Sequence, residues 1–306
     1  MMRLLEKKQK KIVFEANLFK KKTFDFLVIG TKGLLGSKIY DLLNKNITLS
    51  VARKNSDYNL NLKNYKKLDT LFNKIKFKYV INCAAITNLS LCEKNYIRAK
   101  KINTDLPKFL SEKSTKYKFK LIHISTDHFF INKKFKLNNE KDKIFSLNNY
   151  SKTKKDAEKY VKKNKKNLII RTNFTGFKKY LESTFIGWLS YNLIKKKKMN
   201  LFNDMYASTL DVNYCAKVII NLIKKGAIGI YNVGSKDAIN KLEFAKFYAQ
   251  KIKKPIKFNS ISSDILKVNR GKYLGLDVNK VEKKLGIKMI SSKKVILNLS
   301  KNFLKI

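Results

Sequence analysis

The chain has few of the residues that most often build disulfides, metal centres and linkers. Its three cysteines, Cys83, Cys92 and Cys215, show no paired motif spacing, and its only histidines are His123 and His128. These counts argue against a disulfide framework, a zinc cluster and a multi-histidine metal site, and they favour reduced thiols in a cytoplasm. With 2 prolines in 306 residues, no proline-rich linker marks a domain boundary.

Long apolar runs and acidic residues are also scarce. No run approaches the roughly 18–20 apolar residues that cross a bilayer. The stretch 1–23 lacks the apolar segment and cleavage site of a secretory signal. We therefore expect a cytoplasmic protein without membrane insertion, in which residues 1–22 form an N-terminal extension. Asp and Glu number 22 against 69 Lys and Arg, which gives a formal net charge of +47.

The positive charge is spread along the whole chain. Asn, Ile, Phe and Tyr are abundant beside Lys, and all of these residues have A/T-rich codons, so compositional drift of a genome would raise them together. We interpret the charge mainly as drift, with a selected binding surface as the alternative, and predict no specific nucleic-acid partner. A positive field would still concentrate phosphate-bearing ligands near the protein.

Short apolar runs alternate with helical patterns from residue 24 onward. This alternation predicts an α/β protein with a doubly wound parallel sheet (Rossmann-type) that is covered by helices on both faces. The predicted strands are 24–29, 47–52, 79–83, 121–125, 167–171 and 229–233, and the predicted helices are 34–44, 62–75, 99–116, 150–163, 185–195, 212–224, 241–252 and 278–285. Because regularity fades after Gly176, we predict a dinucleotide-binding domain over 23–178 and a smaller C-terminal substrate lobe over 179–306, partly interleaved with it.

A glycine-rich turn joins the first predicted strand to the first predicted helix, where residues 30–36 read GTKGLLG. Glycines permit a tight turn and let a pyrophosphate approach backbone amides, and the helix N-terminus adds unpaired N–H groups. The flanking strand and helix supply the context that this motif needs. The predicted cofactor contacts of this turn are Gly30, Lys32, Gly33, Leu34, Leu35 and Gly36.

The end of the second predicted strand indicates which dinucleotide binds. A site specific for NAD usually has Asp or Glu there, about twenty residues past the glycines. This chain has Arg53 and Lys54 instead. Because cations suit a 2′-phosphate, the sequence favours NADP(H), with NAD(H) as the alternative.

Tyr150 and Lys154 are four residues apart, so on a helix they project from one face. A nearby ammonium favours the phenolate, and a tyrosine pKa lowered towards neutral pH would make a competent proton donor to a carbonyl. In so lysine-rich a chain a surface pair is the alternative. The triplet Ser125, Thr126 and Asp127 places a hydroxyl at the carboxyl end of a predicted strand, where α/β sheets bind ligands.

The order of these motifs resembles the extended short-chain dehydrogenase/reductase family, and within it the dTDP-4-dehydrorhamnose reductase-like branch. The resemblance covers most of the chain from Phe24 onward. Departures lie on the substrate side, where 204–210 lacks a typical proline and Arg270 lacks its flanking proline. The resemblance rests on residues 80–85 (VINCAA), 102–105 (INTD), 124–130 (ISTDHFF), 149–158 with the Tyr-x-x-x-Lys pattern, 229–233 and 275–277.

The resemblance implies an NADPH-dependent reductase of a nucleotide-linked 4-keto sugar, as in dTDP-rhamnose and polysaccharide biosynthesis. Thr126 would polarise the carbonyl, Tyr150 would donate the proton, Lys154 would tune Tyr150, and the cofactor would deliver hydride. No metal ligand is implied. The further cofactor contacts implied are Arg53, Asn61, Leu62, Cys83, Ala84, Ala85 and Asn103, together with Tyr150 and Lys154, and the substrate contacts are Thr87, Asp127, His128 and Trp188.

Other functions share this fold. One is an epimerase or dehydratase of a sugar nucleotide, and another is a non-catalytic NADP-binding regulatory subunit resembling that of methionine adenosyltransferase. The presence of Thr126, Tyr150 and Lys154 favours the enzyme. We expect His123, inside an apolar strand, to be a core residue, and for Trp188 the sequence favours packing, with a substrate contact as the other role. A homodimer is compatible with the sequence.

Overall fold

The computed structural model describes residues 23–131, 136–178 and 184–303. The predicted N-terminal extension, residues 1–22, lies outside the described residues. The helices are α2 (Leu34–Leu42), α3 (Leu68–Lys74), α4 (Leu89–Lys94), α5 (Tyr96–Lys100), α6 (Leu106–Lys116), α7 (Asn149–Val161), α8 (Phe185–Ile194), α9 (Val212–Lys224), α10 (Lys241–Lys251), α11 (Asn279–Leu285) and α12 (Ser292–Phe303). The strands are β1 (Thr23–Ile29), β2 (Thr48–Ala52), β3 (Tyr58–Asn59), β4 (Lys76–Asn82), β5 (Lys120–Ile124), β6 (Leu168–Thr175), β7 (Lys198–Phe202), β8 (Tyr206–Ala207), β9 (Thr209–Asp211), β10 (Gly229–Val233), β11 (Ile239–Asn240), β12 (Lys257–Ile261) and β13 (Tyr273–Leu274).

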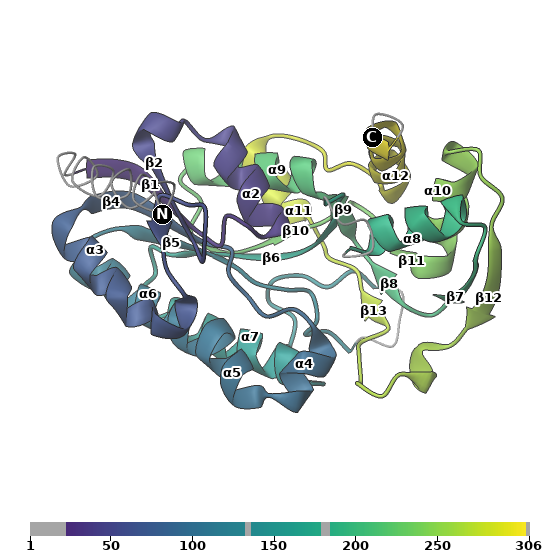
Figure 1. Cartoon of the computed structure of the whole chain (residues 1–306), viewed down its shortest axis with the longest axis horizontal. Coiled ribbons are helices and arrows are strands. Elements are labelled where there is room, and N and C mark those ends of the chain that lie inside the picture. The colour runs from purple at the N-terminus through teal and green to yellow at the C-terminus, as the bar shows by residue number, and fades with distance from the viewer. Residues whose placement is uncertain (1–22, 132–135, 179–183, 304–306) are drawn as a thin grey trace, which may run out of the picture.

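The main sheet has the strand order β10-β6-β5-β4-β1-β2-β3, and β9 also pairs with β6. Every pair in it is parallel. Helices α3, α6 and α7 cover one face, and α2, α9 and α11 cover the other (Figure 1). The predicted doubly wound α/β fold is therefore confirmed.

Two apolar cores lie on the two faces of this sheet, because successive strand side chains point to opposite sides. On β1, Val28 belongs to the core under α2 and α9, whereas Leu27 and Ile29 belong to the core under α3 and α6. Strand β5 follows the same alternation, with Ile122 on the first side and Leu121 on the second. The near-continuous apolar runs read from the sequence reflect this burial on both faces.

Small sheets and three helices form a second region beside the main sheet. Strand β12 pairs with β7, and β8 lies between β11 and β13. Helices α8, α10 and α12 gather there (Figure 1). Strand β10, from the same later part of the chain, joins the main sheet next to β6. The later part is thus divided between the two regions, and the boundary at residues 178 and 179 stays a prediction.

The predicted helix over 99–116 is interrupted in the structure. A π-helical turn, Lys101–Asp105, separates α5 from α6. The wider turn directs Asn103 and Thr104 inward, where Asn103 donates to Thr153 Oγ1 (3.2 Å) and Thr104 donates to the Thr153 carbonyl (2.7 Å). The predicted helix over 62–75 also begins differently, as a 3-10 turn at Leu62–Lys67. Over the described ranges, no helix is both long and apolar enough to cross a membrane.

Candidate active site

The glycine-rich turn after β1 is built by close backbone packing. Gly30 has a φ of +90°, which favours glycine, and its N–H donates to the Val51 carbonyl at 2.8 Å. A Cβ on Gly36 would lie 2.3 Å from the Gly30 carbonyl oxygen, so α2 can approach β1 only with glycine there. Gly33 caps α2 without a side-chain hydrogen bond, which leaves the first N–H groups of the helix available to an anion.

A cavity of about 470 Å³ opens beside this turn. It unites the turn with the end of β2 and with the loop after β4, because carboxyl ends of parallel strands share one edge of the sheet. The predicted residues that line it are Gly30, Lys32, Gly33, Arg53, Asn61, Leu62, Cys83, Ala84 and Ala85. Ile86, Arg98 and Ile102 also line it and were not predicted. Arg98 adds a second arginine to the cavity that holds Arg53.

Six predicted cofactor contacts lie away from the lining of this cavity, and two of them, Tyr150 and Lys154, are described with α7 below. Leu35 and Gly36 are buried, and Leu34 is half-buried against the core under α9. Asn103 is fully buried, and its amide is engaged by protein: its Oδ1 accepts from the Ile86 N–H (2.8 Å) and its Nδ2 donates to the Ile86 carbonyl (2.9 Å). The cofactor contact of Asn103 stays a prediction, because the structure shows its side chain bonded to protein. Asn103 supports the loop after β4, and its inward position follows from the π-turn.

Thr126, Asp127 and His128 follow β5 at the same edge of the sheet. Thr126 is 3 % exposed, and its Oγ1 accepts a hydrogen bond from the His128 N–H at 3.2 Å. Asp127 is buried and accepts from the amide of Asn173 at 2.8 Å. His128 Nε2 lies 3.8 Å from Asp127 Oδ1. The predicted hydroxyl is thus placed beside a buried carboxylate and an imidazole.

Tyr150 stands at the start of α7, where a capping box fixes the backbone. The side chain of Asn148 accepts from the Ser151 N–H (2.8 Å), and Ser151 Oγ accepts from the Asn148 N–H (3.1 Å). The Tyr150 ring packs on Leu89 and Cys92. Burial raises the pKa of Tyr150, while a hydrogen bond with Thr126 lowers it by a smaller amount. The predicted lowering of this pKa is therefore wrong for the protein alone, because loss of solvent outweighs the favourable contact.

Lys154 lies one turn further along α7 and is 1 % exposed. Its Nζ donates to the Ile124 carbonyl at 2.7 Å and lies 3.1 Å from His123 Nε2. Burial lowers the pKa of Lys154 to about 8, and Glu158 opposes this shift. The amine therefore engages β5 beneath the site. This places Lys154 among buried partners rather than on the surface.

Two cations lie near Asp127 and His128. Lys241 begins α10, and Arg270 follows β12; both interact electrostatically with His128. Burial lowers the pKa of Lys241, Asp127 opposes that shift, and Arg270 adds to it. Within the described part of the chain, the buried atoms His128 Nδ1 and Arg270 Nε have no hydrogen-bond partner. The unsatisfied N–H of Arg270 and two cations at one place point to an anionic ligand.

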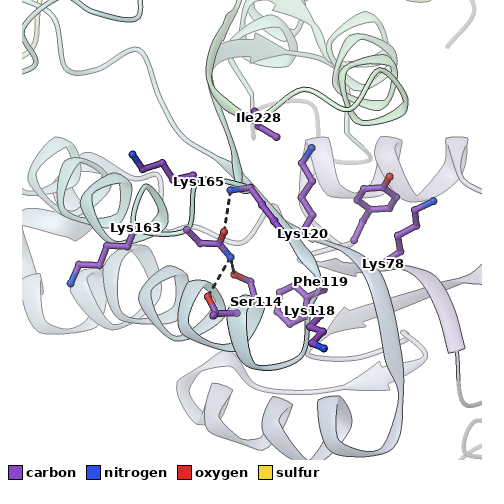
Figure 2. Close-up of a pocket in the computed structure, with 12 residues that line it drawn as sticks. Lys78, Ser114, Lys118, Phe119, Lys120, Lys163, Lys165 and Ile228 are labelled. Atoms are coloured by element: carbon purple, nitrogen blue, oxygen red, sulfur yellow. Dashed lines mark hydrogen bonds between the residues drawn. The ribbon is translucent and has the colours of Figure 1, made fainter.

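A further cavity, of about 890 Å³, lies at the opposite edge of the sheet (Figure 2). It is formed where β4 and β5 begin and where α6 and α7 end. Lysines dominate it, including Lys78, Lys118, Lys120, Lys163 and Lys165. Because its lining includes no predicted site residue, its size does not make it the site. Among the described residues, no group of three or more His, Cys, Asp or Glu side chains is arranged to hold a metal.

Comparison with known proteins decides the family. The family model "RmlD substrate binding domain" matches residues 24–304. The chain belongs to this family. The match covers both the glycine-rich turn and the region of Lys241 and Arg270, so one family accounts for both sides of the site.

Relatives of this RmlD-family chain include two curated proteins. It is 25 % identical over 274 residues to the probable low-salt glycan biosynthesis reductase Agl14 of Haloferax volcanii, which spans 85 % of this chain and 91 % of the relative. It is 24 % identical over 227 residues to the dTDP-4-dehydrorhamnose reductase of Aggregatibacter actinomycetemcomitans, over 72 % of this chain and 76 % of that one. A structure of dTDP-4-dehydrorhamnose reductase from Bacillus anthracis in complex with NADP has a TM-score of 0.83 and 22 % identity, covering 94 % of this chain and 100 % of that one.

Two further predicted substrate contacts of this RmlD-family chain, Trp188 and Thr87, have no contact with Thr126, Tyr150 or Lys154 among the interactions described above. Trp188 stacks on Phe185 with ring centroids 6.2 Å apart, and Phe185 lies under Lys241, 4.5 Å from its Nζ. Thr87 is exposed in the loop after β4. The substrate contacts of Trp188 and Thr87 stay predictions. Lys241 was missed because a single lysine carries no signal among 69 Lys and Arg residues.

Proposed function

We propose that the chain is an NADPH-dependent reductase of a nucleotide-linked 4-keto sugar. The observation that carries this proposal is the contact between Thr126 and Tyr150, two buried hydroxyls at the edge of the sheet that also holds the glycine-rich turn. Paired hydroxyls of this kind can hold and protonate one carbonyl oxygen. The names of two relatives, a glycan biosynthesis reductase and a dTDP-4-dehydrorhamnose reductase, support the same reaction class.

The residues at the glycine-rich turn fit a dinucleotide. The absent side chains at Gly30 and Gly36 leave the backbone open to a pyrophosphate, and α2 directs its N–H groups to the same place. Exposed Arg53 and Arg98 line the cavity, where they suit the extra phosphate of NADPH. NADPH bound there would supply the hydride.

The chain's own residues would handle the carbonyl and its proton. Thr126 and Tyr150 would each donate a hydrogen bond to the carbonyl oxygen, and Tyr150 would transfer its proton as that oxygen becomes an alcohol. Burial of both hydroxyls excludes water from the step. The raised pKa of Tyr150 keeps the phenol protonated, as a proton donor requires.

The cations on the other side of Asp127 would bind the nucleotide diphosphate. Lys241 and Arg270 lie at that end of the site, and Arg270 Nε has no hydrogen-bond partner among the residues that the structure describes. An anionic group would accept from Arg270 Nε and offset the charge of the two cations. The proposal therefore places the sugar between Tyr150 and these cations.

The experiment is to follow NADPH oxidation against a panel of nucleotide-linked 4-keto sugars, with wild type and Tyr150→Phe. We expect turnover of at least one sugar by wild type and its loss in the variant. Turnover that survives the substitution would overturn the mechanism. NADPH binding without turnover of any sugar would favour a non-catalytic regulatory subunit.

A further inference from the structure

Three buried side chains form a line of hydrogen bonds beneath the site. Asn82 and His123 are both 0 % exposed and are register partners on the parallel strands β4 and β5. Asn82 Nδ2 lies 3.3 Å from His123 Nδ1, and His123 Nε2 lies 3.1 Å from Lys154 Nζ. At the far end of the line, Asn82 Oδ1 accepts from the Ala84 N–H at 3.1 Å. The line therefore connects the loop of the dinucleotide cavity to Lys154.

The Ala84 N–H fixes the direction of every bond in this line. A backbone N–H can only donate, so the Asn82 atom that faces it must be the oxygen. The Asn82 NH₂ group then faces His123 and donates to Nδ1, which must carry no proton. A neutral imidazole with a bare Nδ1 carries its proton on Nε2, so His123 donates towards Lys154.

A lysine nitrogen can accept that hydrogen bond only as a neutral amine, because an ammonium has no lone pair. The amine keeps two hydrogens, one of which bonds the Ile124 carbonyl at 2.7 Å. With a charged Lys154, His123 would have to accept at Nε2 and carry its proton on Nδ1, facing the Asn82 NH₂ group at 3.3 Å. Turning the Asn82 amide would move the conflict to the Ala84 N–H at 3.1 Å. Either arrangement leaves two buried donors in contact.

The charged and titratable groups around Lys154 do not remove the preference for its neutral amine. Glu158, on the same helix, favours the ammonium, but its carboxylate already accepts from Arg171 (2.8 Å) and from Ser125 (2.7 Å). Cys83, after β4, is held as a thiol, since burial raises its pKa to about 12. Burial and the nearby Lys154 lower the pKa of His123 well below its ordinary value, so the ring stays neutral.

We propose that His123 is a positioning residue that donates to Lys154 and so lets Lys154 lose and regain a proton inside the protein. The line of hydrogen bonds is complete with the neutral amine, and the ammonium costs it one buried contact. The pKa of Lys154, lowered by burial to about 8, then lies within reach of neutral pH. The part of this inference that concerns turnover rests on the proposed function. The titration of Lys154 is a property of the protein without cofactor or substrate.

The first test needs neither cofactor nor substrate. The free energy of unfolding of wild type is compared with that of Lys154→Met between about pH 7 and about pH 10.5. Because the folded pKa of Lys154 is lowered, the unfolded chain binds the extra proton in this window, and wild type gains stability relative to the variant as pH rises through about 8. Lys120→Met is the matched comparison at the other end of β5: burial also lowers the pKa of Lys120, whose Nζ donates to the Ala227 carbonyl at the lysine-rich cavity (Figure 2), so its titration contributes to stability without any contact with His123.

Replacing His123 then decides the direction of the bond. With His123→Phe, we expect the midpoint of the Lys154 titration to rise by about one pH unit, because a donor to the neutral amine is lost. If His123 instead accepts from an ammonium, the same substitution lowers the midpoint. His123→Gln supplies a second variant, whose amide oxygen can face Lys154; the inference requires a raised midpoint there too, and an unchanged one overturns it. In both His123 variants, the pH dependence of the stability difference made by Lys120→Met should stay as it is with His123 present.

The second test uses turnover. We expect the alkaline limb of the kcat/KM profile to follow the Lys154 titration and to move upward by about one pH unit in His123→Gln. A limb that does not move, in an enzyme that still binds NADPH, overturns the link between His123 and turnover. If wild type does not bind NADPH at all, the proposed function is overturned, but the result of the stability test remains valid because it needs no cofactor.

Discussion

The ring of His128 stands edge-on to the ring of Tyr150, with the two centroids 5.7 Å apart. This contact holds the tyrosine by its ring, and Tyr150 also belongs to a buried apolar cluster with Leu89 and Cys92. Removal of the hydroxyl should therefore leave the ring in place. We expect Tyr150→Phe to lower kcat by about 10²–10⁴-fold while the Kd for NADPH changes little. Steady-state kinetics and a fluorescence titration with NADPH check this; a parallel loss of cofactor affinity would assign Tyr150 to binding.

Arg53 lines the dinucleotide cavity from the end of β2. A phosphate contact from an arginine contributes about 1.5–3 kcal/mol, so we expect Arg53→Ala to raise the Kd for NADPH roughly 10- to 100-fold and to change the Kd for NADH much less. Calorimetric titration of wild type and variant with NADPH and with NADH measures the change in Kd for each cofactor. Lys78→Ala removes the same charge at the opposite edge of the sheet (Figure 2) and should affect neither cofactor. Equal weakening of both cofactors by Arg53→Ala would contradict a role at the 2′-phosphate.

Lys241 begins α10 beside Asp127 and Arg270. If these cations bind the diphosphate, Lys241→Met should raise KM for the sugar nucleotide about tenfold or more, with the Kd for NADPH unchanged. Lys246→Met is the matched control, because Lys246 lies on the same helix and is exposed over Phe258. An unchanged KM in Lys241→Met would place the diphosphate elsewhere.

Glu158 and Arg171 form a fully buried ion pair with Nη2 to Oε2 at 2.8 Å. Glu158→Gln leaves the guanidinium without its counter-charge, so we expect the free energy of unfolding to fall by about 3–5 kcal/mol. The double substitution Glu158→Leu and Arg171→Met should recover much of that loss. Urea denaturation measures both, with Glu112→Gln as the exposed control, for which roughly 0–1 kcal/mol is expected. A loss as small as in the control would mean that the pair is hydrated.

Gly36 packs against the turn at Gly30, where a Cβ would lie 2.3 Å from the carbonyl oxygen. Gly36→Ala should therefore push α2 away from β1, cost about 1–3 kcal/mol in stability and weaken NADPH binding. Gly33→Ala provides the graded comparison, since its Cβ would lie 3.1 Å from the same oxygen. Thermal unfolding and NADPH titration of the two variants should rank Gly36→Ala as the more damaged. The reverse order would contradict the packing described for this turn.

The sequence predicted the features that depend on local pattern. Apolar runs such as 24–29 have two buried faces, so they are visible without knowledge of their neighbours, and the glycine turn is recognisable because a strand and a helix flank it. Thr126 and Tyr150 could be placed from their positions at a strand end and a helix start. The short strands β7 and β12 were missed because exposed polar residues break their pattern.

Features that depend on partners distant in sequence could not be predicted in this way. The direction of Lys154 is set by His123 and the Ile124 carbonyl on a strand about thirty residues earlier, so helix spacing alone predicted the wrong effect on Tyr150. The inward direction of Asn103 could not be predicted because nothing in its local sequence reveals a π-turn. Lys241 becomes distinctive only through its burial near Asp127.

Strand β10 lies in the main sheet, although it comes from the later part of the chain, and it covers β6 by parallel pairing from Leu168 to Thr172. A polypeptide that stopped after Gly176 would leave β6 as an open edge, without β9 and β10, and would invite pairing between molecules. The part of the chain up to Gly176, which contains the glycine-rich turn, is thus not expected to work as a separate cofactor-binding domain. Tandem fusions, circular permutants and split-protein reporters made from this chain should keep residues 168–233 together.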